Sequence, residues 1–218
     1  MNLTDLPKGE FTAVSEAVFK KIVSEVGSEV FRKTYKKFVH PSNAYIHYYI
    51  HKGAINNTTT VQPQDAYLLI IGDVQTGLIN VNDTLDNEMG EFIVIGDVVC
   101  DYFFNQHGKS TFIDGNLKVN KILNHAVDDS SLIISNDLET AFYYANNGWA
   151  SVGGNTTMEY GIGYILPLAF ADAEKAAVVP KNSEKESAAF LGTTVGEIED
   201  GDFMYLLLEE KIIAYAQD

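Results

Sequence analysis

Residues 69–76 read LIIGDVQT, and the same order of residue types returns four more times further along the chain. Each copy has an apolar run, then Gly or Asn, then Asp or Asn, and then a second run in which apolar and polar side chains alternate. The other copies are IVIGDVVC at 93–100, FIDGNLKV at 112–119, IISNDLET at 133–140 and the degenerate SVGGNTTM at 151–158. Self-similarity of this kind indicates a repeat architecture.

The spacing of the copies indicates which architecture this is. The residues at the bend position, Gly72, Gly96, Gly115, Asn136 and Gly154, lie 24, 19, 21 and 18 residues apart. A strand–helix–strand unit needs about 30 residues, and these segments have no helical periodicity. The spacing fits one coil of a β-solenoid, in which each strand pairs in parallel with its equivalent one coil further on. Gly or Asn supplies the left-handed backbone conformation that such a bend uses.

We therefore predict a mainly β protein, a right-handed parallel β-helix of about five rungs at residues 61–168. Residues 1–60 are predicted to form an N-terminal cap, with an amphipathic helix at 10–39, broken at Gly27, and a strand at 45–51. Residues 169–218 are predicted to form an acidic C-terminal cap, in which the apolar run 203–214 fits a helix or a strand pair. A hairpin-built sandwich is the competing fold, although no two-residue Asn-Gly or Asp-Gly hairpin joins successive units.

The repeated units resemble those of the bactofilin, or polymer-forming cytoskeletal, group of bacterial β-helix proteins. The resemblance is carried by IVIGDVVC and its equivalents and covers residues 67–165, under half of the chain. It implies a right-handed parallel β-helix without enzymatic activity, and some members of the group polymerise end to end. This chain departs from the group in its irregular spacing and in the segments before and after the coils. Such caps prevent a solenoid from polymerising through its end strands.

The charge of the chain is strongly negative and unevenly spread. Its 218 residues include 15 Lys and Arg against 30 Asp and Glu, a formal net charge of −15. Residues 1–60 hold eight basic and five acidic residues, so the negative charge belongs to the rest. We expect no nucleic-acid binding, because phosphate contacts need a positive surface. The N-terminus lacks a signal-like segment and no apolar run approaches the about 20 residues of a membrane span, so we expect a cytoplasmic protein without a membrane partner.

Residues that carry chemistry are sparse. His47 and His51 share one strand face but lack the glutamate of a His-Glu-x-x-His zinc site, and a remote third ligand would be needed. The single cysteine, Cys100, is predicted to point inward as a small apolar side chain. The sequence has one arginine and neither a Gly-x-Ser-x-Gly elbow nor a phosphate loop. We therefore predict no enzymatic activity, no metal and no cofactor.

Short polar side chains recur directly after the bend position. Asp73, Asp97, Asn116, Asp137 and Asn155 are predicted to stack as a structural ladder about 4.8 Å apart. In that ladder they would accept hydrogen bonds from bend amides. Cation binding is the alternative, but the Gly-Gly-x-Gly-x-Asp calcium repeat is absent.

These patterns favour a non-enzymatic acidic binding protein, namely an immunity-type inhibitor that neutralises a basic protein such as a bacterial nuclease toxin. The predicted contact residues are the carboxylates of the segments between rungs: Asp83, Asp86, Glu88, Glu91, Asp128 and Asp129. The alternative is a bactofilin-like structural module that self-associates. Six basic residues of the N-terminal helix are predicted to form a solvated face, or else a docking surface for an acidic partner: Lys20, Lys21, Arg32, Lys33, Lys36 and Lys37.

Overall fold

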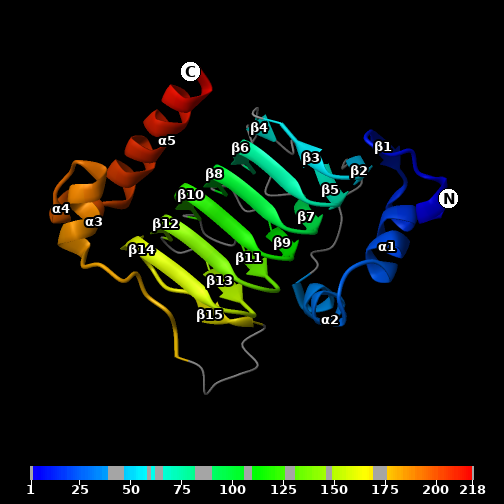
Figure 1. Cartoon of the computed structure of the whole chain (residues 1–218), viewed down its shortest axis with the longest axis horizontal. Coiled ribbons are helices and arrows are strands. Elements are labelled where there is room, and N and C mark those ends of the chain that lie inside the picture. The colour runs from blue at the N-terminus through cyan, green and yellow to red at the C-terminus, as the bar shows by residue number, and fades with distance from the viewer. Residues whose placement is uncertain are drawn as a thin grey trace.

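Parallel strands coil into a β-solenoid of about five turns, with helices at both ends (Figure 1). The computed structural model describes residues 2–38, 47–57, 60–61, 66–81, 90–105, 110–125, 131–145, 149–168 and 176–217. The predicted β-solenoid is therefore confirmed, and the competing sandwich of hairpins is wrong. The right-handed sense of the coil stays a prediction.

Each coil contributes one strand to each of two sheets. Sheet A has the order β1-β2-β5-β7-β9-β11-β13-β15. Its strands are β1 (Phe11–Val14), β2 (His47–Lys52), β5 (Ala66–Ile71), β7 (Glu91–Ile95), β9 (Ser110–Asp114), β11 (Ser131–Ile134), β13 (Trp149–Val152) and β15 (Leu166–Pro167). Between neighbouring strands of this sheet, pairing is parallel except for β1 with β2, which is antiparallel.

Sheet B has the order β14-β12-β10-β8-β6-β3, and the short strand β4 also pairs with β6. Its strands are β3 (Ile55–Asn56), β4 (Thr60–Val61), β6 (Val74–Asn80), β8 (Val98–Phe104), β10 (Leu117–Asn124), β12 (Leu138–Tyr144) and β14 (Thr156–Ile162). The register matches the sequence repeats, because Leu117 lies opposite Val98 on one side and Leu138 on the other.

The main core lies between the two sheets. Alternate side chains of each strand point inward and stack from rung to rung, as Val94, Ile113 and Ile134 do in sheet A. Cys100 is among them and is 1% exposed, so its predicted inward orientation is confirmed. Burial raises the pKa of its thiol, because the thiolate would lose its hydration. Each large apolar side chain buried here contributes about 1.5–3 kcal/mol.

The coil begins one turn earlier than predicted. Strand β2 was assigned to the N-terminal cap, but it pairs in parallel with β5, with Tyr48 opposite Tyr67. Gly53 occupies the bend of this first rung, and a Cβ on Gly72 would lie 2.6 Å from its carbonyl carbon. The close approach of successive bends therefore excludes a side chain at Gly72.

Two helices cover the outer face of sheet A. After the 3₁₀ turn η1 (Leu3–Asp5) and β1 come α1 (Glu16–Glu25) and α2 (Glu29–Phe38). Phe19 and Ile22 of α1 and Phe31 of α2 pack against this face. The predicted break at Gly27 is confirmed, and its φ of +76° lies in the left-handed region. The predicted start of the helix at residue 10 is wrong, because Phe11–Val14 pair with β2 as a strand and α1 begins only at Glu16.

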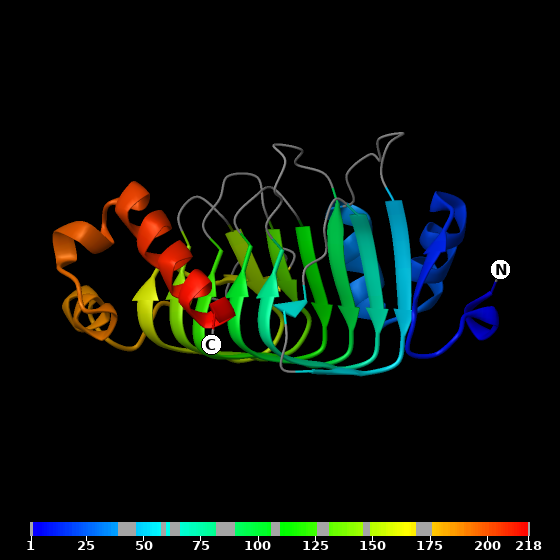
Figure 2. The ribbon, with the colours of Figure 1, turned by 90° about the horizontal axis from the view of Figure 1, so that it is seen from above.

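Three helices form the C-terminal cap: α3 (Glu184–Leu191), α4 (Val195–Ile198) and α5 (Gly201–Gln217). Residues 203–214, for which the sequence allowed a helix or strands, are helical. Met204 and Leu208 of α5 pack with Leu78, Phe104 and Ile122 on the outer face of sheet B. Figure 2 shows α5 alongside the strands of this sheet, while α1 and α2 lie at the opposite end of the solenoid.

Candidate partner-binding surfaces

The predicted bend ladder is a continuous row of hydrogen bonds. Asp73 Oδ1 accepts the backbone N–H of Asp97 at 2.9 Å, and Asp97 Oδ1 accepts that of Asn116 at 2.8 Å. Asn116 Oδ1 then accepts from Asp137 at 3.2 Å, and Asp137 Oδ1 from Asn155 at 2.7 Å. Each of these four acceptors thus satisfies the bend amide of the next rung. All five residues are exposed, so the row also places three carboxyl groups at the surface.

Five of the six predicted contact residues, Asp83, Asp86, Glu88, Asp128 and Asp129, lie outside the described residues. The sixth, Glu91, is 1% exposed, so the prediction that it is an exposed contact residue is wrong.

Glu91 is buried because α2 covers it. It is the first residue of β7 and lies on the outer face of sheet A, two residues before Ile93. Tyr35 of α2 donates its hydroxyl proton to Glu91 Oε2 at 2.6 Å. The pKa of the Tyr35 hydroxyl is raised, mainly because the group is buried and secondly because the negative charge of Glu91 lies beside it. This contact therefore holds α2 on the solenoid.

The sequence carries a signal for the burial of Glu91. Strand alternation in EFIVI at 91–95 places Glu91 on the same face as two isoleucines.

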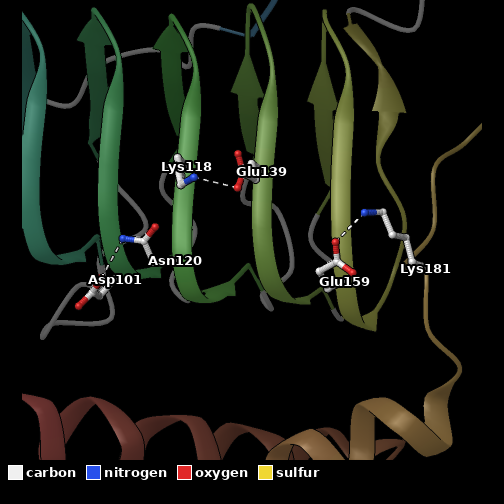
Figure 3. Close-up of polar contacts among 6 residues, drawn as sticks. All are labelled: Asp101, Lys118, Asn120, Glu139, Glu159 and Lys181. Carbon is white, nitrogen blue, oxygen red and sulfur yellow. Dashed lines mark hydrogen bonds and ion pairs between the residues drawn. The ribbon is translucent and has the colours of Figure 1, made fainter.

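The outer face of sheet B carries a polar stripe in which neighbouring rungs neutralise each other (Figure 3). Lys118 Nζ lies 2.8 Å from Glu139 Oε1, and Lys181 Nζ lies 2.6 Å from Glu159 Oε1. Asp101 accepts a hydrogen bond from Asn120 at 3.0 Å, and its charge is balanced by Lys121, whose Nζ lies 3.6 Å from Asp101 Oδ2. Exposed pairs of this kind contribute about 0–1 kcal/mol each. Their main consequence is that this stripe offers little net charge to a partner.

The C-terminal helices hold the largest described concentration of acidic residues. Residues 176–217 contain eight acidic residues and three lysines. Seven of the carboxylates are exposed and are called the acidic cap below: Glu184, Glu186, Glu197, Glu199, Asp200, Asp202 and Glu210. Within the cap, Ser183 holds the pKa of Glu186 below its usual value through side-chain and backbone hydrogen bonds. Hydrogen bonds from Thr193 and Thr194 do the same for Glu197, so both groups stay charged near neutral pH.

The basic residues of the N-terminal helices are partly neutralised within their own segment. Lys20 pairs with Glu16 and Lys33 with Glu29, each at 2.6 Å and four residues apart. Arg32 donates to the backbone carbonyl of Gly27 at 2.7 Å. These contacts are typical of a solvated helix face.

The two histidines of β2 differ in environment. His47 is exposed, whereas His51 is 4% exposed and has no hydrogen-bond partner for either ring nitrogen among the described residues. Burial lowers the pKa of His51, and the ring of Phe11 lies 4.7 Å from it. Over the part of the chain that the structure describes, no group of three or more His, Cys, Asp and Glu side chains is placed to hold a metal ion. In the same part, no helix has the length and apolar character needed to cross a membrane.

Comparison with known proteins gives no relative from which a function could be transferred. No family model, no curated protein and no solved structure matches the chain. The likeness of the repeats to the bactofilin group therefore stays a resemblance in sequence, and function has to be argued from the surface.

Proposed function

We propose that this protein is a non-enzymatic binding protein that holds a basic protein partner, in the manner of an immunity-type inhibitor of a basic toxin such as a nuclease. The observation that carries the proposal is the acidic cap. Its carboxylates face solvent in a chain of net charge −15. A surface of one sign attracts and orients a partner of the opposite sign.

The distribution of charge over the solenoid supports the proposal. Lysines of the sheet B stripe pair with carboxylates of the neighbouring rung, so that stripe contributes little to the net charge. Lys118 and Lys121 are examples. Residues 176–217, which include the acidic cap, hold Lys185 and Lys211 besides Lys181, too few to balance their eight acidic residues. This surplus negative charge is available to a partner.

The strands at both ends of the solenoid are covered by other segments of the chain, which favours a binding module over the polymer-forming alternative. The outer edge of β14 is occupied, because Lys181 and Asn182 donate backbone N–H groups to the carbonyls of Met158 and Glu159 at 2.8 and 2.9 Å. Ser187 Oγ accepts the N–H of Gly161 at 2.8 Å. At the other end, the antiparallel β1 breaks the parallel order. A further coil added end to end would have to displace these contacts.

The proposal is tested with the products of the neighbouring genes. Each is purified, and any nuclease activity is assayed with and without this protein at low and at high salt. We expect one basic enzyme to be inhibited stoichiometrically, with inhibition weakening as salt rises, because salt screens exposed charges. Glu199→Lys and Asp200→Lys together should weaken inhibition more than Glu139→Lys with Glu159→Lys on the stripe. If no basic neighbour product binds even at low salt, the proposal fails.

A further inference from the structure

The helix α5 exposes a large apolar side chain, Leu206, on the side that faces away from sheet B. Met204 and Leu208 are 0% exposed and face sheet B. In a helix that packs on one side, the opposite side is normally polar. Here Leu206, which lies between these two buried positions on the other side of the helix, is 57% exposed.

Acidic side chains flank this exposed leucine. Asp202 and Glu210 lie one turn before and after Leu206 and are also exposed. Phe203 and Tyr205 add partly exposed aromatic surface beside them. These five residues are called the α5 face below. Because no lysine lies among them, the α5 face combines apolar surface with unbalanced negative charge.

We propose that the α5 face is the docking site for the basic partner. It binds an amphipathic basic segment of that partner, whose row of apolar side chains packs against Leu206. This inference rests on the proposed function and names the surface that performs it. Apolar contact at the centre of such a face supplies affinity, while the carboxylates at its rim steer and orient the partner. In a typical interface, a few central apolar residues carry most of the binding energy.

A second copy of this chain fits the α5 face poorly. It would bring its own Asp202 and Glu210 against the same carboxylates, and its acidic cap would add to the repulsion. A basic segment instead pairs with both carboxylates and covers Leu206. Charge complementarity therefore selects a basic partner over self-association.

The test uses the full chain and a defined probe, a fluorescent synthetic peptide of leucine and lysine spaced to form a helix with one leucine face. Its binding is measured by anisotropy. Leu206→Gln should weaken binding about tenfold, the loss typical of a central contact residue. Asp202→Asn with Glu210→Gln should weaken binding several-fold and reduce its salt dependence.

Two matched controls make the result specific to this helix. Val179→Gln changes an exposed apolar residue, 63% exposed, that is not part of α5. Asp73→Asn with Asp137→Asn removes the same amount of charge from the bend ladder. Both controls should bind the peptide within twofold of the unaltered chain, and because Leu206 is exposed its variant should keep its circular dichroism spectrum.

The outcomes separate this inference from the proposed function. If the peptide binds all variants equally while the inhibition assay above succeeds, the α5 face is not the docking site and the proposed function stands. If the inhibition assay finds no basic partner, the proposed function fails, whatever the peptide does. If sedimentation shows a dimer that Leu206→Gln dissociates, the occupant is a second copy and the proposal is wrong.

Discussion

Replacing Asp97 with alanine should destabilise the solenoid, because it removes the hydrogen bonds that join two successive bends. Asp97 Oδ1 accepts two hydrogen bonds from Asn116, one from the backbone N–H at 2.8 Å and one from the side-chain amide at 2.9 Å. A hydrogen bond to a charged group contributes about 1.5–3 kcal/mol, and exposure of the ladder places the expected effect at the lower end. We therefore expect Asp97→Ala to lower the free energy of unfolding by about 1–2 kcal/mol.

The conservative variant provides the control for this prediction. Asp97→Asn keeps an oxygen acceptor at the same position, so we expect a loss of less than about 0.5 kcal/mol, typical of surface changes. Urea unfolding followed by circular dichroism gives both values. Hydrogen exchange at the Asn116 amide should accelerate in the alanine variant. Equal stability of Asp97→Ala and the unaltered chain, or equal losses in both variants, would refute a structural role for the ladder.

Three further predictions concern the helices and the core. Tyr35→Phe removes a donor from the buried Glu91 while keeping the ring, so urea unfolding should show a loss of about 1–3 kcal/mol; no loss would mean that the contact does not hold α2. The folded pKa of Glu186 lies below its unfolded value, so its contribution is complete above about pH 4.3 and is lost as the pH falls. Ser183→Ala should reduce this acid dependence in pH-resolved unfolding, and an unchanged profile would contradict the assignment. Cys100 should react with a thiol reagent only after unfolding, because its thiol is buried and its pKa is raised; rapid reaction of the folded chain would place it at the surface.

The solenoid could be predicted from sequence because its bends repeat. Gly72 and Gly96 stand at points where successive backbones approach too closely for a side chain, and Asp73 and Asp97 follow them to satisfy the bend amides. Both requirements act on single residues at fixed positions. The repeats could therefore be aligned in the correct register although their spacing varies.

The first rung escaped prediction because its bend lacks the acidic residue. Ala54 follows Gly53 where Asp73 follows Gly72, so the sequence pattern is incomplete there. The burial of Glu91 was missed because charge was given more weight than strand alternation. Its partner, Tyr35, lies 56 residues earlier in the chain, and no local pattern reports such a contact.

The α5 face was missed for a related reason. The apolar run 203–214 was consistent with complete burial in a cap, and its composition does not distinguish a covered side from an exposed one. Packing on sheet B uses Met204 and Leu208 and leaves Leu206 outside. The exposed apolar surface is therefore a property of the tertiary structure.

Multi-angle light scattering of the protein, alone and with a basic neighbour product, tests the central claim most directly. If the chain is a closed solenoid that binds a basic protein, it should have the mass of one chain, 24.1 kDa, at every concentration. With the partner at low salt it should form a complex of defined stoichiometry that dissociates as salt rises. A mass that grows with concentration, without any complex, would contradict the account and favour a polymer-forming module.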